Sequence, residues 1–270
     1  MNKVIILTGD EKRHEFFRKY MGSSRHFQVL KSYCEQSEPE RIIKSGSTSE
    51  LRRIHLQSRK QTELDFFGVF TEKIQDHSNP KFIPRGMIND PKIQEEIILL
   101  NPDYILSYGC SIIKGDLISA FPNRFINIHL GLSPYYRGSG TNYWPLVNKE
   151  PQFVGTTFMY IDEGVDTGQI IHQIRGRVYP LDTVHTIGNR LIQDTAAVAE
   201  KIIENAEKII GFDDLPLPEN EQRYYMNKDF SEESVVKLYN NFENGMISEY
   251  LENVEKITKS SPIIQNSNFF

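Results

Sequence analysis

Apolar runs and amphipathic stretches alternate along the first half of the chain, which is typical of strands separated by helices. Short apolar runs predict buried strands at residues 4–7, 27–30, 103–107 and 125–128. Helical periodicity and helix-start signals predict helices at residues 11–21, 49–76, 91–100 and 114–120. Elements that alternate at this spacing predict an α/β fold, with a mainly parallel twisted sheet flanked by helices.

Residues 49–76 are expected to form a long helix with Ser49 as its N-cap. Its apolar stripe is expected to contain Leu51, Ile54 and His55, and less regularly Leu64, Phe67 and Val69. Its basic residues favour either a solvated helix face or a patch that contacts a phosphate-bearing substrate; they are Arg52, Arg53, Arg59 and Lys60. The segments at 36–49 and 79–89 predict loops.

The second half of the chain predicts a strand pair, a second long helix and a small C-terminal part. Residues 152–161 and 169–177 are expected to pair across a turn. The helix is expected to be capped by Asp182 and stopped by Gly211, with Ile187, Leu191, Val198 and Ile202 on its apolar face. A Pro-rich linker at 212–222 would separate a main domain, residues 1–211, from a helical extension, residues 223–270, whose tail is expected to be loose from Ser260.

Composition and charge restrict the classes of function. The 270 residues are 39% hydrophobic and 25% charged, which is ordinary for a globular protein. The net charge of −5 argues against binding of long nucleic acid, which requires a positive face. Cys34 and Cys110 have no Cys/His cluster around them, so we expect no metal site and a reducing, cytoplasmic location. No apolar run is long enough to predict a membrane span or a signal peptide.

The segment from residue 125 to residue 168 contains the clearest candidate chemistry. Asn127 and His129 are two apart on a predicted strand, so their side chains are expected to share one face. A loop with Pro134, Gly138 and Gly140 follows, and Asp166 lies in a glycine-flanked turn.

These three polar side chains suit acyl transfer to an amine. The Asn127 amide would donate to the negative oxygen of a tetrahedral intermediate, a contact worth roughly 3–4 kcal/mol in other oxyanion holes. His129 would donate to the same oxygen or accept the proton that leaves the amine. Asp166 would orient the imidazole or order a water molecule.

Each of these residues also has an ordinary structural interpretation. A strand histidine is commonly packed, an aspartate between glycines is commonly a turn residue, and a strand-end asparagine commonly bonds backbone. The combination of all three with the intervening loop favours catalysis.

The combined pattern resembles the formyltransferase family that uses 10-formyltetrahydrofolate. This family includes the glycinamide ribonucleotide, methionyl-tRNA and sugar N-formyltransferases. Its Asn-x-His segment is matched by Asn127-Ile128-His129-Leu130-Gly131-Leu132-Ser133-Pro134, with Arg137-Gly138 following. Its Asp-x-Gly element is matched by Asp166-Thr167-Gly168, preceded by Gly155-Thr156-Thr157. The resemblance extends from about residue 80 to residue 210 and implies a Rossmann-like formyltransferase fold, with residues 1–211 as the catalytic domain.

The resemblance also implies roles for individual residues. The catalytic residues would be Asn127, His129 and Asp166, with 10-formyltetrahydrofolate as co-substrate and no metal. The folate pocket would be formed largely by backbone, at Gly109, Cys110, Ser111, Ile112 and Ile113, and at Ile161, Asp162, Gly164 and Val165. An ordinary strand-to-helix turn remains an alternative for residues 109–113.

Departures from the family favour a nucleotide-linked amino sugar as the acceptor. The turn Thr8-Gly9-Asp10-Glu11 lacks the phosphate-gripping residues of the glycinamide ribonucleotide enzymes and carries two carboxylates. Only residues 223–270 follow the linker, whereas the tRNA enzymes have a C-terminal barrel and a basic surface. The remaining resemblance is to sugar N-formyltransferases of surface-glycan biosynthesis, and a UDP-linked 4-amino-4,6-dideoxy sugar on a pseudaminic-acid-type route is the favoured substrate.

The expected substrate-binding residues are Arg13, Arg85, Gly86, Tyr136, Arg137, Gly138 and Thr141. Arg52 and Arg59 are further candidates for the diphosphate, and Tyr143 and Trp144 for the acceptor pocket, although each of these side chains could instead be structural. Two alternatives stay open. One is a truncated methionyl-tRNA-type or other small-amine formyltransferase, and the other is a non-catalytic folate- or nucleotide-binding module. The oligomeric state is also open, with a homodimer as one option.

Overall fold

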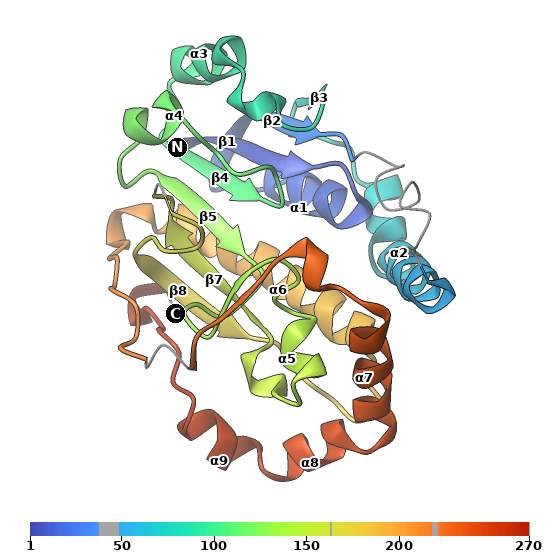
Figure 1. The fold of residues 1–270 in the computed structure, drawn as a ribbon. Helices are drawn as coiled ribbons and strands as arrows, with labels where there is room; N and C mark the ends of the chain where they lie inside the picture. The colour runs from blue at the N-terminus through green and yellow to red at the C-terminus, as the bar shows by residue number, and fades with distance from the viewer. Residues whose placement is uncertain (38–48, 163, 218–220, 270) are drawn as a thin grey trace.

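The computed structural model describes residues 1–37, 49–162, 164–217 and 221–269 (Figure 1). These residues form a seven-stranded sheet with the order β3-β2-β1-β4-β5-β7-β8. The first five strands in this order are parallel, and β7 is antiparallel to both β5 and β8. The strands are β1 (Asn2–Gly9), β2 (Phe27–Glu35), β3 (Pro80–Ile83), β4 (Tyr104–Tyr108), β5 (Phe125–His129), β7 (Gly155–Tyr160) and β8 (Ile170–Arg175).

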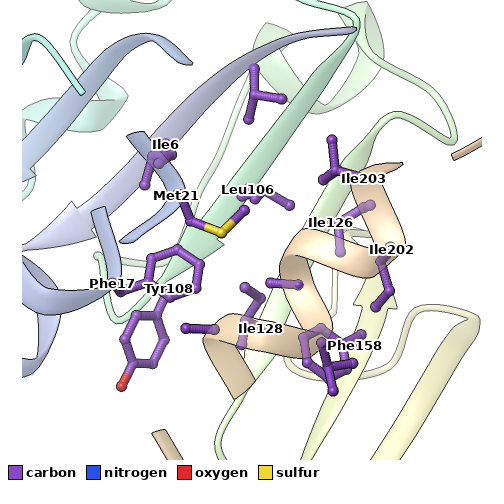
Figure 2. Packing of buried hydrophobic residues seen from close by; sticks show 14 of the residues in the cluster. Ile6, Phe17, Met21, Leu106, Tyr108, Ile126, Ile128, Phe158, Ile202 and Ile203 are labelled. Carbon is purple, nitrogen blue, oxygen red and sulfur yellow. The ribbon is translucent and has the colours of Figure 1, made fainter. Parts of the chain in front are cut away.

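Helices cover both faces of this sheet, as alternate residues of β1 show. Val4 and Ile6 belong to a cluster with α1 (Lys12–Gly22), α2 (Glu50–Lys73) and α6 (Val184–Glu204). Ile5 and Leu7 belong to a cluster with α3 (Pro91–Leu100) and α4 (Asp116–Ala120) on the other face. Figure 2 shows side chains of the first cluster, including Ile6 and Phe17. Burial of each such side chain stabilises the fold by roughly 1.5–3 kcal/mol. The predicted fold class is therefore confirmed.

The buried face of α2 differs from the predicted stripe. Ser49 caps the helix as expected, accepting from the backbone N–H of Arg52 at 3.3 Å. Ile54, Leu64 and Val69, however, are exposed, so the stripe was wrong at these three positions. The buried residues are separated by four or eight positions and include polar side chains; they are His55, Glu63, Phe67 and Thr71. The stripe was misjudged because α2 packs on α1 partly through ion pairs, which an apolar pattern does not show.

Two predicted boundaries also need correction. The segment 79–89, expected to be a loop, contains β3, whose backbone pairs with β2, and the short helix η1 (Met87–Asn89). The helix α6 is capped by Thr183 rather than Asp182, because the Thr183 and Thr186 side chains form a reciprocal capping box. It ends at Glu204 and not at Gly211, and η3 (Ala206–Lys208) follows. The predicted loop at 36–49 falls almost entirely outside the described residues.

Residues 223–269 pack against the main sheet domain. A third cluster joins Trp144 and Leu146 of α5 (Trp144–Val147) to Leu238 of α7 (Glu232–Glu243) and Met246 of α8 (Met246–Glu252). Figure 1 shows α7, α8 and α9 (Val254–Lys259) following one another around the side of the molecule that carries α5. The remaining short elements are β6 (Tyr136–Gly138), η2 (Pro151–Phe153), β9 (Arg223–Tyr225), η5 (Asn227–Asp229) and η6 (Ser267–Phe269).

The tail after Ser260 is not loose, contrary to the expectation. The Gln173 side chain accepts from the Ile264 N–H at 2.9 Å, and His172 Nδ1 accepts from the Asn266 N–H at 3.0 Å. Phe269 is buried in the main cluster. The tail therefore lies along β8, which is the edge strand of the sheet and has backbone groups to satisfy.

Candidate active site

Strand β5 brings Asn127 and His129 to the same face, as the two-residue spacing predicts. Asn127 lies beside Ser107 of β4, whose hydroxyl donates to Asn127 Oδ1 at 2.9 Å. This bond fixes the orientation of the Asn127 amide, because the amide oxygen accepts from Ser107 and the NH₂ group therefore points away from Ser107. The NH₂ group is therefore the one presented to the site.

Asp166 meets both of these side chains. Its Oδ1 accepts from Asn127 Nδ2 at 3.3 Å, and its Oδ2 lies 3.3 Å from His129 Nδ1. The backbone of Asp166 is left-handed, with φ of 56°, a conformation that aspartate adopts more readily than most residues. The Gly138 N–H also donates to Asp166 Oδ2, at 3.1 Å. The three side chains singled out from the sequence are thus brought together.

His129 is held between two acceptors. Its Nδ1 faces the Asp166 carboxylate and its Nε2 lies 3.1 Å from the carbonyl oxygen of Tyr136. A neutral imidazole donates from only one nitrogen, whereas the protonated ring donates from both. The pair of acceptors therefore suits a ring that gains a proton during reaction, with the nearby carboxylate stabilising the charge.

Strand β6 supplies further contacts to the site. Arg137 Nε donates to the Asp166 carbonyl oxygen at 3.0 Å, and the other guanidinium nitrogens contact Gln222 Oε1, at 3.3 Å, and the Asp214 carboxylate. Tyr136 is fully buried with its hydroxyl on Glu150, and the Thr141 hydroxyl donates to the Leu130 carbonyl. Three expected substrate contacts, Tyr136, Arg137 and Thr141, thus have partners within the protein.

The other candidate arginines differ in how far they are engaged. Arg13 pairs with Glu63 at 2.8 Å and with Glu11, and Arg59 lies 3.4 Å from Glu11. Burial lowers the pKa of Arg13, but the two carboxylates outweigh it and hold the pKa above its ordinary value.

Arg52 and Arg85 have no carboxylate partner among the described residues. The Arg52 guanidinium lies 4.9 Å from the centre of the Phe230 ring. Arg85 is exposed between β3 and η1. Of the candidate arginines, these two are therefore the ones that no carboxylate of the described residues already neutralises.

Glu35, at the end of β2, was not identified from the sequence. Its buried carboxylate accepts from the backbone N–H groups of Gly86, at 2.8 Å, Ile88, at 3.3 Å, and Ser111, at 2.7 Å. It therefore joins the Arg85-Gly86 loop to the loop at 109–113. The sequence contains no local signal for this role, because the predicted strand was ended at Leu30 and all three donors lie more than fifty residues away.

The two segments expected to bind folate lie against the same apolar cluster. Ile113 belongs to the cluster of β1, α3 and α4, and Cys110 and Ile161 pack against it. Gly109 has φ of 70°, and a side chain there would meet His14, at 2.4 Å from its Nε2. Burial, with Glu35 nearby, raises the pKa of Cys110 to about 12, so its thiol is neutral.

The turn after β7 has its own internal bonds. Asp162 Oδ1 accepts from the Gly164 N–H at 3.0 Å and from the Thr167 hydroxyl at 2.9 Å. These bonds stabilise the turn between β7 and β8, which contains Val165 and Asp166. Within the described ranges, no group of three or more His, Cys, Asp or Glu side chains is placed to hold a metal ion.

Comparison with known proteins identifies the family of this chain. The model of the formyl transferase family matches residues 41–202. The methionyl-tRNA formyltransferase of Desulforamulus reducens is 34% identical over 119 residues, which are 43% of this chain and 37% of that protein. That of Alkaliphilus oremlandii is 33% identical over 141 residues, or 50% of this chain and 44% of that protein. The chain thus spans less than half the length of these curated relatives.

Solved structures share the fold at low sequence identity. The formyltransferase PseJ from Anoxybacillus kamchatkensis, in complex with UDP-4,6-dideoxy-4-formamido-L-AltNAc and tetrahydrofolate, has a TM-score of 0.50 and 23% identity, covering 87% of this chain and 97% of its own. An N-formyltransferase from Helicobacter canadensis, with folinic acid and dTDP-3-aminofucose, has a TM-score of 0.55 and 18% identity, covering 86% and 73%. Because the family model matches more than half of the residues, the chain belongs to the formyl transferase family.

Proposed function

We propose that the protein transfers a formyl group from 10-formyltetrahydrofolate to the primary amine of a nucleotide-linked amino sugar. The observation that carries this proposal is the contact of one carboxylate, Asp166, with both Asn127 and His129 at 3.3 Å. An amide donor, an imidazole and a carboxylate are the groups that attack of an amine on a formyl carbon requires.

The proposed reaction needs no further co-reactant. The amine nitrogen forms a bond to the formyl carbon, the bond from that carbon to N10 of the folate breaks, and one proton passes from the amine to N10. The Asn127 NH₂ group donates to the oxygen that becomes negative. His129 exchanges one of its two ring contacts for the substrate, where it donates to the same oxygen or carries the proton, and Asp166 stabilises its charged form.

The folate would enter between residues 109–113 and the turn at 161–165. Support comes from the packing of both segments against one apolar cluster, which suits the flat pterin ring. The Ser111 N–H is already bonded to Glu35, so pterin contacts would use other backbone groups of these segments. Tetrahydrofolate and folinic acid are present in the complexes of the two fold-related enzymes named above.

A nucleotide-linked amino sugar is the proposed acceptor for two reasons. One of those fold-related enzymes was solved with a nucleotide-linked amino sugar and the other with a nucleotide-linked formamido sugar, and the net charge of −5 disfavours a tRNA. Arg85 and Arg52 would contact the diphosphate or the base, because neither has a carboxylate partner among the described residues. Within this class, we propose a UDP-linked 4-amino-4,6-dideoxy sugar.

A second candidate is formylation of methionyl-tRNA. It is favoured by the sequence relatives, which carry that name, although the chain matches less than half of their length. A panel of acceptors separates the candidates, using 10-formyltetrahydrofolate with UDP- and dTDP-linked amino sugars and with methionyl-tRNA. Formylation of the tRNA alone would contradict the proposed acceptor.

The catalytic assignment is tested by single-turnover assays of Asn127→Ala, His129→Ala and Asp166→Ala. Each variant is expected to lose formyl transfer while folding and binding folate normally. Arg53→Ala is the control, because Arg53 is exposed and its ion-pair partner among the described residues, Glu50, belongs to its own helix. Folate binding by the wild-type protein without turnover of any amine would instead indicate a binding module.

A further inference from the structure

The three-residue strand β6 contacts both ionisable members of the site. The Tyr136 carbonyl oxygen lies 3.1 Å from His129 Nε2, and the Gly138 N–H donates to Asp166 Oδ2 at 3.1 Å. Between them, Arg137 Nε donates to the Asp166 carbonyl at 3.0 Å. The position of β6 therefore decides how the imidazole and the carboxylate are oriented.

Strand β6 is not part of the seven-stranded sheet. Among the described residues its strand partner is β9, which pairs with it in parallel in a separate two-stranded sheet. The Arg223 N–H donates to the Tyr135 carbonyl at 2.9 Å, and the Ser139 N–H donates to the Tyr225 carbonyl at 2.8 Å. These two bonds hold β6 at its beginning and at its end.

The side chains of β9 strengthen this pairing. The Tyr225 ring is stacked on Trp144, with centroids 4.1 Å apart and planes 6° apart, and its hydroxyl accepts from Asn148 Nδ2 at 2.9 Å. Arg223 lies 5.3 Å above the Tyr136 ring and pairs with Glu150 at 2.8 Å, and Glu150 also accepts from the Tyr136 hydroxyl. Strand β9 thus contacts Tyr136, the residue whose carbonyl faces His129, through its side chains as well as its backbone.

We infer that Tyr225 and Arg223 are positioning residues for the catalytic pair, acting through β6. Residues 223–225 would then serve the site without touching either substrate. A side chain at Gly138 would come within 2.2 Å of the Tyr225 carbonyl, which shows how closely the two backbones approach. This inference rests on the proposed formyl transfer for its kinetic test, but not for its spectroscopic test.

The test compares Tyr225→Ala with Tyr225→Phe and Tyr224→Ala. Tyr225→Ala removes the stack, whereas Tyr225→Phe keeps it. Tyr224 is the matched control, because it lies on the same strand with its side chain 57% exposed. Trp144 is the one tryptophan of the chain, so its fluorescence reports whether β9 is docked.

The histidine side chains are observed by ¹⁵N NMR, with the His129 signals assigned by means of His129→Gln. Tyr225→Ala is expected to shift Trp144 emission to the red, to change both His129 nitrogen signals, and to lower kcat about 100-fold with little change in either KM. Tyr225→Phe and Tyr224→Ala should keep the wild-type spectra. If Tyr225→Ala releases Trp144 but leaves the His129 signals and kcat unchanged, the inference is overturned.

Arg223→Gln keeps the test decisive if Tyr225→Ala does not fold. It removes the ion pair with Glu150 and leaves the ring stack in place, so a smaller change of the His129 signals is expected, and unchanged signals would overturn the inference. If the wild-type protein formylates no acceptor, the proposed function fails. Altered His129 signals in Tyr225→Ala would still support the positioning role in that case.

Discussion

Replacement of Glu35 by glutamine should loosen both loops that are proposed to hold ligands. Glu35 is buried, and its two oxygens accept from the N–H groups of Gly86, Ile88 and Ser111. Glutamine has the same shape but only one acceptor oxygen, so its NH₂ group must face at least one of these donors. The Ser111 N–H would lose its acceptor if the oxygen stays on the Gly86 side.

The size of the effect follows from these bonds. A buried N–H left without an acceptor costs about 1–3 kcal/mol, and each bond that changes from a charged to a neutral acceptor loses about 1 kcal/mol. The expected loss of unfolding free energy in Glu35→Gln is therefore about 3–5 kcal/mol. Folate binding to Glu35→Gln must order the loosened loops. For each 1.4 kcal/mol that this ordering takes from the binding free energy, the KM for folate should rise about tenfold.

Urea denaturation, amide hydrogen exchange and the KM for folate measure these effects. Faster exchange is expected at Gly86 and Ser111. Asp10→Asn is the matched control, because Asp10 accepts from the Ser37 N–H at 2.9 Å at the end of the neighbouring strand and contacts neither loop. Exchange at Ser111 that is as slow in Glu35→Gln as in the wild type would refute the reasoning.

Three further predictions concern pH, the tail and Arg137. Burial lowers the pKa of His55 and His172 to about 4 and that of His185 to about 3. Below about pH 6.5 the unfolded chain therefore binds more protons than the folded protein. The unfolding free energy should fall by up to 1.4 kcal/mol per pH unit for each histidine, down to about pH 4. Equal urea midpoints at pH 7 and pH 5 would contradict this. Phe269→Ala should lower the unfolding free energy by about 2–3 kcal/mol, measured by urea denaturation, because the ring is buried in the main cluster. Asp214→Ala should lower kcat with less than about 1 kcal/mol change in stability, because it frees the guanidinium that holds the Asp166 carbonyl; an unchanged kcat would count against that role.

The parts of the site that the sequence predicted depend on local geometry. The two-residue spacing on β5 places Asn127 and His129 on one face whatever the partner strands are. Strand β7 pairs with β5 in antiparallel fashion, so the turn that follows β7 begins beside Phe125 at the start of β5, and Asp166 reaches Asn127 and His129 from this turn. Short apolar runs likewise located most strands, because a buried parallel strand is apolar on both faces.

The parts that were missed depend on partners distant in the sequence. The contacts of Arg137 with Asp214 and Gln222 were missed because its position in the loop reveals nothing of these partners. The apolar stripe of α2 was right at His55 and Phe67 but wrong at three other positions, because charged Glu63 is buried in their place by its ion pair with Arg13. A sequence pattern records hydrophobicity, whereas these positions are decided by pairing of charges and of backbone groups.

The pairing of β6 with β9 has a consequence for the order in which the site forms. Asn127, His129 and Asp166 lie within about forty residues of one another, and Asn127 and His129 lie on β5 of the main sheet. The acceptor for His129 Nε2 and the donor to Asp166 Oδ2 are supplied by β6. The strand partner of β6 begins at Arg223, and Gln222, directly before it, contacts Arg137 across 85 residues of sequence. Activity should therefore appear only after the C-terminal segment has docked, and Trp144 fluorescence during refolding should change no later than formyl transfer returns.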